Sequence, residues 1–155
     1  MAELKPGDQA PDFRLPDQDG TPTAMGGFRG RKLLLYFYPK ADTPGCTAQA
    51  CSVQESLPDL GRLGIDAVGI SPDPPERQLK FARKYKLTFK LLSDPGHEVA
   101  SAYGAWGEKS MYGKKYEGII RSSFLVDEKG RIVQAWYKVS PKDTVPLARQ
   151  ALAGV

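Results

Sequence analysis

Cysteine and histidine are scarce in this chain of 155 residues. The only cysteines are Cys46 and Cys51, and the only histidine is His97. Together they offer three of the usual zinc ligands, and no Cys-x-x-Cys pair exists. A zinc site is therefore the weaker interpretation. The missing Cys-x-x-Cys pair also argues against a disulfide reductase of the thioredoxin type.

Long hydrophobic runs are absent too. No apolar run approaches the roughly 18 residues that a membrane span needs. The first eight residues, Met1–Asp8, lack the hydrophobic centre of a signal peptide. We therefore expect a cytoplasmic protein that does not bind membranes. In a reducing cytoplasm, two cysteines are more typical of catalysis or redox sensing than of a permanent disulfide.

The charge balance carries no strong signal for a polyanionic partner. The net charge is +4, and the basic residues are scattered apart from small clusters at 29–32 and 114–115. We read these clusters as solvated surface and expect no nucleic-acid binding. The glycines of 104–118 form no phosphate-binding pattern, so no nucleotide cofactor is expected. Apolar content of 41% and charged content of 26% are ordinary for one globular domain.

The hydrophobic pattern predicts strands that alternate with helices through the middle of the chain. Proline and glycine mark most of the boundaries, while Pro58 should bend or end the helix that contains it. This order implies a mixed sheet flanked by helices. We expect a hairpin within 11–24 that turns at Asp19-Gly20, strands at 33–38, 65–71 and 91–92, helices at 44–60, 75–85, 97–103 and 141–153, an irregular stretch at 104–118, and a second hairpin of strands 122–127 and 131–137.

Cys46 lies where the strand 33–38 gives way to the helix that begins near residue 44. At the start of a helix the backbone N–H groups have no intrahelical acceptor, and the helix dipole is positive. Such a site favours the thiolate, which is the nucleophilic form of cysteine. Cys51, five residues later, could capture an oxidised Cys46. We therefore interpret the chain as a redox enzyme.

Helix geometry limits what these two thiols can do. Five positions on an α-helix turn the side chains roughly 140° apart and separate the Cα atoms by nearly 9 Å. A disulfide needs Cα atoms within about 7 Å and side chains that point together. An intact helix therefore cannot carry a Cys46–Cys51 bond. Either the turn between them unwinds on oxidation, or Cys51 is a structural thiol and Cys46 works with an external one.

Several short segments occur in one order along nearly the whole chain. Pro39, Thr43 and Cys46 fit the pattern Pro-x-x-x-Thr-x-x-Cys. With its other segments, the chain resembles the peroxiredoxins, and most closely the bacterioferritin comigratory protein or peroxiredoxin Q subfamily. The resemblance implies one domain over 1–155 with a thioredoxin-like α/β fold, in which a central mixed β-sheet is flanked by helices and preceded by an N-terminal β-hairpin. The segments are GDQAPDF (7–13), FYPKADTPGCT (37–47), LLSD (91–94), WGEK (106–109) and RSSFLVD (121–127).

The resemblance also implies a reaction. Cys46 corresponds to the cysteine that attacks hydrogen peroxide or an organic hydroperoxide and becomes a sulfenic acid. Cys51 corresponds to the resolving cysteine, which forms an intramolecular disulfide that a thioredoxin-like or glutaredoxin-like donor reduces. No metal, haem or flavin is implied. We expect a monomer, with a weak dimer as the alternative.

Three further residues have a functional and a structural interpretation. Thr43 could hydrogen-bond the thiolate and the peroxide, or cap the helix. Pro39 ends the strand and shields the thiol. Arg121 opens an apolar strand, so its guanidinium either reaches solvent or, as the resemblance implies, favours the Cys46 thiolate and polarises the peroxide. Gln49 departs from the family, in which many members have an acidic residue.

Two other functions remain open. A thiol–disulfide oxidoreductase would act on protein disulfides. A redox sensor would use the Cys46/Cys51 switch to expose a surface for a partner. Reaction with peroxide separates both from a peroxidase.

Overall fold

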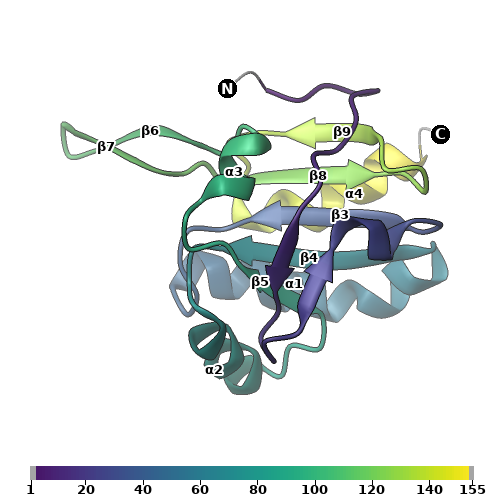
Figure 1. The fold of residues 1–155 in the computed structure, drawn as a ribbon, viewed down its shortest axis with the longest axis horizontal. Helices are drawn as coiled ribbons and strands as arrows, with labels where there is room; N and C mark the ends of the chain where they lie inside the picture. Colours follow the sequence, from purple (N-terminus) through teal and green to yellow (C-terminus); the bar gives the residue numbers. More distant parts are fainter. Residues whose placement is uncertain (1–2, 154–155) are drawn as a thin grey trace.

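A five-stranded mixed sheet forms the centre of the molecule (Figure 1). The structure is a computed structural model that describes residues 3–153. The strand order is β5-β4-β3-β8-β9; β3 pairs in parallel with β4, and β4 with β5, whereas β8 is antiparallel to β3 and β9. The predicted mixed sheet is therefore confirmed. The strands are β3 (Lys32–Phe37), β4 (Ile65–Ser71), β5 (Lys90–Ser93), β8 (Ser122–Val126) and β9 (Ile132–Trp136).

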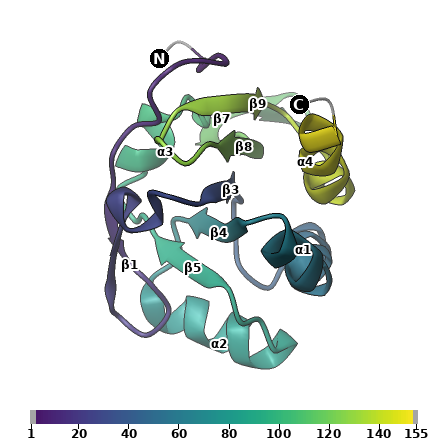
Figure 2. The same ribbon diagram turned by 90° about the vertical axis from the view of Figure 1, so that its right-hand side faces the viewer.

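Helices cover both faces of this sheet, which explains the unbroken apolar run of β3. Leu34 and Tyr36 pack in one cluster with residues of α1, α2 and α4, whereas Leu35 and Phe37 pack on the other side with residues of α3. Figure 2 shows α1 and α4 on one face and α3 on the other. A strand buried on both faces has no polar side to show in its sequence. The helices are α1 (Pro44–Arg62), α2 (Pro75–Tyr85), α3 (Glu98–Ala102) and α4 (Thr144–Ala153), with short 3₁₀ turns at Met25–Phe28 and Pro141–Asp143.

The N-terminal hairpin is present where the turn residues predicted it. Strands β1 (Arg14–Pro16) and β2 (Pro22–Ala24) are antiparallel. The Asp17 carboxylate accepts hydrogen bonds from the backbone N–H groups of Asp19 and Thr21, at 2.9 and 3.0 Å. Gly20 takes a positive φ of 80°, which glycine adopts without steric cost.

The irregular stretch predicted at 104–118 is wrong. Strands β6 (Trp106–Met111) and β7 (Lys114–Ile119) form an antiparallel hairpin that projects from the body of the molecule (Figure 1). Tyr112 and Gly113 connect the strands with φ of 52° and 79°. Positive φ at both positions is the mark of a type I′ turn, usually announced by Asn-Gly or Asp-Gly. Tyr-Gly gave no such signal.

Pro58 was expected to bend or end the helix that contains it. It does not end the helix. Helix α1 continues through it to Arg62. A proline inside a helix removes one backbone donor, and Leu60, beyond it, is fully buried in the cluster under α1. This packing holds the last turn in place. Within the described residues, no helix is long and apolar enough to cross a membrane.

Gly69 of β4 offers a test of how tightly this core is packed. A Cβ there would lie 2.9 Å from Tyr36 Cζ and 3.0 Å from Tyr38 Cε1, and both rings are fully buried. We expect Gly69→Ala to lower the free energy of unfolding by about 1–3 kcal/mol through overpacking, as measured by urea denaturation. Gly61→Ala is the control, because nothing lies within 4 Å of its Cβ position. Equal stability of the two variants would contradict this description of the core.

Candidate active site

Two carboxylates hold the loop that connects β3 to α1. The Asp73 carboxylate accepts a 2.7 Å hydrogen bond from the Ala41 N–H. The Asp42 carboxylate accepts one from the Tyr85 hydroxyl at 2.7 Å and pairs with Lys84 at 3.0 Å. These partners, Tyr85 first and then Lys84, lower the pKa of Asp42. Asp42 takes a left-handed φ of 61°, so its side-chain contacts hold a backbone conformation that non-glycine residues rarely adopt.

Cys46 lies in the first turn of α1, as predicted. The helix begins at Pro44 after Thr43, and the first backbone bond joins the Thr47 N–H to the Thr43 carbonyl at 2.8 Å. The Cys46 N–H thus belongs to the free donors of the helix start, where the dipole favours negative charge. The side chain is only 1% exposed. Burial limits access of bulk water to the sulfur.

Sheet register brings Arg121 to this thiol. Phe37 of β3 pairs with Ser122 of β8, so Arg121, just before β8, lies beside the end of β3 from which the chain leads to Cys46. Its Nη2 donates to Cys46 Sγ at 3.2 Å. Arg121 is half-buried and does not simply reach into solvent. A permanent cation in contact with a buried sulfur favours the thiolate.

Gln49 and Thr144 complete a polar chain behind the arginine. Arg121 Nη1 donates to Gln49 Oε1, and Gln49 Nε2 donates to Thr144 Oγ1 at 2.7 Å. Gln49 and Thr144 are both buried. The guanidinium thus contacts Cys46 with one nitrogen and Gln49 with the other, which fixes its plane. Sequence reasoning noted Gln49 only as a departure; its position three residues after Cys46 places it on the same helix face.

Thr43 and Pro39 lie in the loop before Cys46, and neither forms a hydrogen bond with the Cys46 sulfur. Thr43 occupies the cap position of α1, but its hydroxyl donates to the Lys40 carbonyl at 2.8 Å and does not cap the helix. A role for this hydroxyl toward peroxide stays a prediction. Pro39 is half-buried directly after the last buried residue of the β3 segment, Tyr38. It follows the end of β3, as predicted; its role in shielding the thiol stays a prediction.

Cys51 lies farther along the same helix and is not bonded to Cys46. Both cysteines are free thiols, Cys46 buried and Cys51 half-buried. The helix is continuous between them. A wound α1 keeps two residues five positions apart on different faces. The structure is therefore the reduced arrangement, in which the two sulfurs cannot join.

Tyr36 of β3 and Tyr38, directly after the strand, belong to the cluster in which Cys46 is buried. Burial raises the pKa of Tyr36 and of Tyr38 far above the usual value for a phenol. Both therefore stay neutral around neutral pH. Tyr38 donates from its hydroxyl to Gln78 Oε1 at 2.5 Å. Beneath the thiol the sheet thus presents neutral aromatic surface, and Arg121 is the charged group in contact with the sulfur.

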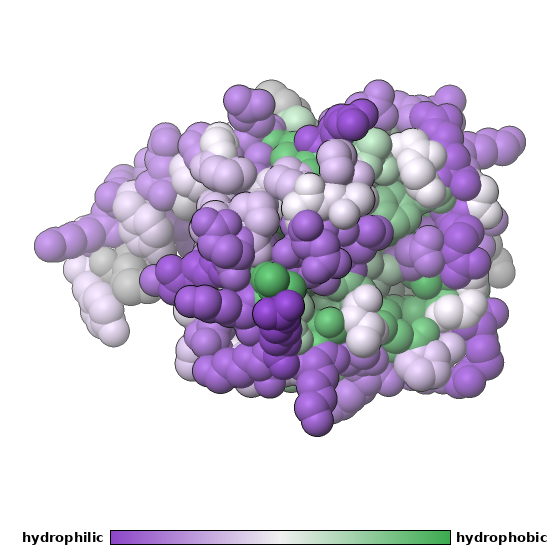
Figure 3. Space-filling model, turned by 60° about the horizontal axis from the view of Figure 1, so that its bottom comes forward, coloured by the Kyte–Doolittle hydropathy of each residue, from purple (hydrophilic) through white to green (hydrophobic). Residues whose placement is uncertain are grey.

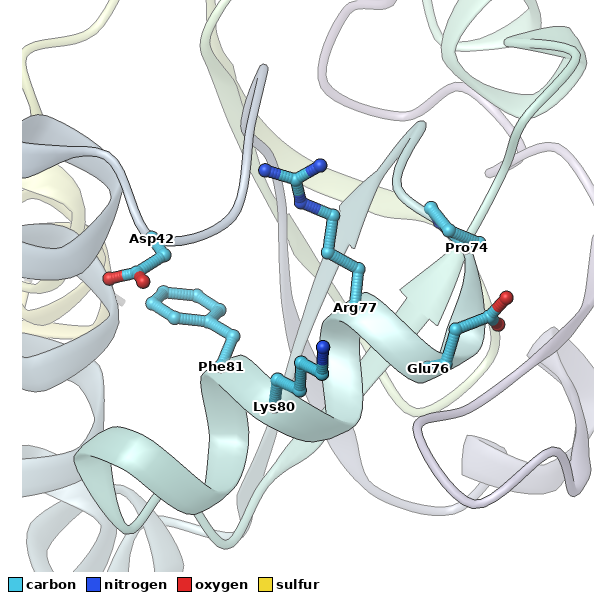
Figure 4. Close-up of a pocket in the computed structure, with 6 residues that line it drawn as sticks. All are labelled: Asp42, Pro74, Glu76, Arg77, Lys80 and Phe81. Carbon is cyan, nitrogen blue, oxygen red and sulfur yellow. The ribbon is translucent and has the colours of Figure 1, made fainter.

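A pocket of about 460 Å³ lies beside this site but does not contain it. Its lining comes from the Asp42 loop and from α2 (Figure 4). In the close-up, Phe81 lies near Asp42, whereas Glu76 points away from the loop. Neither Cys46 nor Arg121 lines it, so size does not identify the chemical site here. Within the described residues, the thiols and His97 weighed as zinc ligands form no cluster of three; His97 instead stacks on Trp106 with ring centroids 3.7 Å apart.

The chain matches a known protein family over most of its length. The family model for AhpC/TSA proteins matches residues 6–135. The chain belongs to the AhpC/TSA family. Peroxiredoxin Bcp of Escherichia coli is 52% identical over 132 residues, covering 85% of each chain. A putative peroxiredoxin of Mycobacterium tuberculosis is 51% identical over 150 residues, covering 97% of this chain and 96% of its own.

Solved structures of AhpC/TSA relatives agree with the thioredoxin-like fold. A structure of the bacterioferritin comigratory protein of Xanthomonas campestris, described in terms of its alkyl peroxide reduction activity, matches with a TM-score of 0.85 and 34% identity. It covers 92% of this chain and 91% of its own. The subfamily resemblance seen in the sequence is thereby confirmed. This AhpC/TSA member is a peroxiredoxin of the bacterioferritin comigratory protein and peroxiredoxin Q type.

The forked contact of Arg121 predicts that lysine cannot replace it. A single ammonium cannot hold both Cys46 Sγ and Gln49 Oε1 in the guanidinium geometry. We expect Arg121→Lys to slow the reaction of Cys46 with peroxide by roughly 10- to 100-fold, the equivalent of about one lost charge-assisted hydrogen bond. Stopped-flow kinetics would measure the rate of this reaction. Arg62→Lys, at an exposed position, is the control and should react with peroxide as fast as the wild type. An equally fast reaction of Arg121→Lys would contradict a role for Arg121 in the site.

Proposed function

We propose that this peroxiredoxin reduces hydrogen peroxide and organic hydroperoxides through Cys46, with Cys51 as its resolving cysteine. The observation that carries the proposal is the 3.2 Å contact of Arg121 with Cys46 Sγ in the first turn of α1. A helix start and a guanidinium both favour the thiolate. Peroxidase activity of the chain's class is supported by its family and relatives; the steps below are our proposal.

In the first step, the Cys46 thiolate attacks the distal oxygen of the hydroperoxide. The S–O bond forms as the O–O bond breaks, and the leaving oxygen takes a proton to depart as water or an alcohol. The sulfur becomes a sulfenic acid, a two-electron oxidation. Arg121 stabilises the negative charge that moves from sulfur to the leaving oxygen. The Thr43 hydroxyl can contact the same peroxide by rotating away from the Lys40 carbonyl.

In the second step, the Cys51 thiol attacks the sulfur of the sulfenic acid. An S–S bond forms and water leaves. Since the wound α1 separates the two side chains, its first turns must open locally. Each backbone hydrogen bond contributes about 1 kcal/mol net, so opening one turn near a helix end is within the usual range of local unfolding. A thioredoxin-like or glutaredoxin-like dithiol then reduces the disulfide by exchange.

The proposed cycle requires no metal, flavin or haem, since the thiols and the donor dithiol carry all the electrons. One domain acting as a monomer in the cytoplasm stays our expectation for its setting. A stopped-flow measurement with hydrogen peroxide tests the peroxidase directly. A rate that matches a free thiol and does not respond to Arg121→Lys would instead favour a redox sensor.

Cys46→Ser tests the first step. The hydroxyl of serine stays protonated at neutral pH and cannot attack peroxide, so we expect peroxide consumption with a dithiol donor to fall to background. Cys51→Ser is the matched control, because it removes the other thiol by the same substitution and should still consume one equivalent of peroxide, whereas Cys46→Ser should consume none. Full activity in Cys46→Ser would refute the assignment of the peroxidatic cysteine.

Cys51→Ser tests the second step. One equivalent of peroxide should still oxidise Cys46, and the sulfenic acid should persist because no internal thiol can reach it. We expect the intact mass to increase by one oxygen and the sulfenic acid to be trapped by dimedone. We also expect that a thioredoxin system no longer recycles the oxidised enzyme. The wild type should instead lose two hydrogens in intact mass. Unchanged recycling in Cys51→Ser would show that an external thiol resolves Cys46.

A further inference from the structure

The β6–β7 hairpin rises beside the end of the sheet that carries the site. In Figure 1, β3 points toward the side from which the hairpin extends, and Figure 3 shows the hairpin as the largely hydrophilic projection at the left. Arg121 follows β7 after Ile120 alone, and the Ile120 N–H donates to the Ala105 carbonyl at 2.8 Å, just before β6. The base of the hairpin is therefore tied to the segment that holds Arg121.

One face of the hairpin is open because two glycines face each other across it. Gly107 pairs with Gly118, and the next pair on this face is Lys109 with Tyr116. A Cβ on Gly118 would lie 3.4 Å from Lys109 Cδ. Since Gly118 is nearer the base than Tyr116, the lysine side chain leans back toward the base. There Ile120, whose Cδ1 lies 3.1 Å from the Gly107 Cβ position, leads into Arg121.

Lys109 differs from the other charged residues of the hairpin. Its side chain is half-buried, whereas Glu108, Lys114, Lys115 and Glu117 are exposed. Within the described part of the chain, no carboxylate lies within 4 Å of its ammonium, which lies 6.0 Å from the ring centroid of Tyr116. This cation is therefore not neutralised by a carboxylate of the hairpin, and its charge can act on neighbouring groups.

The electrostatic surroundings of Lys109 agree with the direction in which its side chain leans. Burial first, and then repulsion by Arg121, lower the pKa of Lys109, whereas the negative charge of Cys46 raises it. The Tyr116 ring faces the lysine across the hairpin. The influence is reciprocal: if the thiolate stabilises the ammonium, the ammonium stabilises the thiolate to the same extent.

We propose that Lys109 is a second cation of the active site, which acts with Arg121 to stabilise the thiolate of Cys46. This inference rests on the proposed role of Cys46 as the attacking thiol. The groups around the sulfur fit it, since Arg121 and Lys109 are cationic and Tyr36 and Tyr38 stay neutral. Lys109 does not contact the sulfur in a hydrogen bond; it acts through its charge.

The test compares Lys109→Met with Lys114→Met, both in the Cys51→Ser background. Each variant loses one positive charge from the same face of the hairpin, but Lys114 lies at the exposed tip, paired with Met111. With Cys51 replaced, Cys46 is the only thiol. Its rate of alkylation by iodoacetamide, a neutral reagent, is measured from pH 5 to 9. We expect Lys109→Met to move the profile to higher pH, with alkylation about two- to fivefold slower at the acidic end.

The outcomes separate this inference from the proposed function. Lys109→Arg should restore the pH profile of alkylation. In 1 M salt, the alkylation profiles of Lys109→Met and its parent should differ less, because salt screens a half-exposed charge. Coincident profiles for Lys109→Met and Lys114→Met would overturn the inference, even if peroxide reacts normally. If Lys109→Met shifts the profile while the parent ignores peroxide, the electrostatic role of Lys109 stands and the peroxidase proposal fails.

Discussion

The pairing of β3 with β8 is the constraint on which the site depends. Phe37 lies opposite Ser122, and this register sets Arg121 beside the point where the chain leaves the sheet for Cys46. A slip of one residue would turn every side chain of β8 to the other face. Because both strands are buried on both faces, such a slip would also disturb the core. The packing that stabilises the sheet therefore also positions the guanidinium at the thiol.

The reduced site and the proposed disulfide make opposite demands on α1. Contact between Arg121 and Cys46 requires the first turn to be wound, as does the chain from Arg121 through Gln49 to Thr144 on α4. A bond to Cys51 requires that same turn to open. The thiolate–arginine contact is strongest while the sulfur is negatively charged. In the proposed cycle, oxidation to a neutral sulfenic acid weakens this contact, and so lowers the cost of opening the helix at the step that requires it.

The hairpin gives the site a second side. On one side of the site lies the loop before α1, which contacts of Asp42 and Asp73 hold in place. The residue just before β8, Arg121, contacts Cys46. The β6–β7 hairpin adjoins them, and the half-buried side chain of its Lys109 leans toward the base of the hairpin, which leads into Arg121. Arg121 contacts the buried sulfur, and the role inferred for Lys109 is to act on it through charge; both effects favour a negatively charged sulfur. The pattern of charge around Cys46 thus agrees with the chemistry proposed for it.

The sequence by itself determined the parts of the molecule that local patterns specify. The apolar run of β3, the strand β4 and the proline start of α2 were predicted within a residue or two, because burial and proline chemistry act over short stretches. The position of Cys46 at a helix start followed from the same signals. The β6–β7 hairpin was missed, because its Tyr112-Gly113 turn lacks the usual residues and its facing glycines resemble those of a loop.

The family resemblance had already named Arg121 as a partner of Cys46, but only the tertiary structure decided that Gln49 and Thr144 extend this contact. Arg121 and Gln49 are 72 residues apart, and Gln49 and Thr144 are 95 apart. No local periodicity connects such residues; their contacts arise from the strand order of the sheet and from the packing of α4 beside α1. The sequence named the chemistry of Cys46, and the fold selected the partners that surround it, because contacts between distant segments depend on how complete elements pack and not on any short pattern.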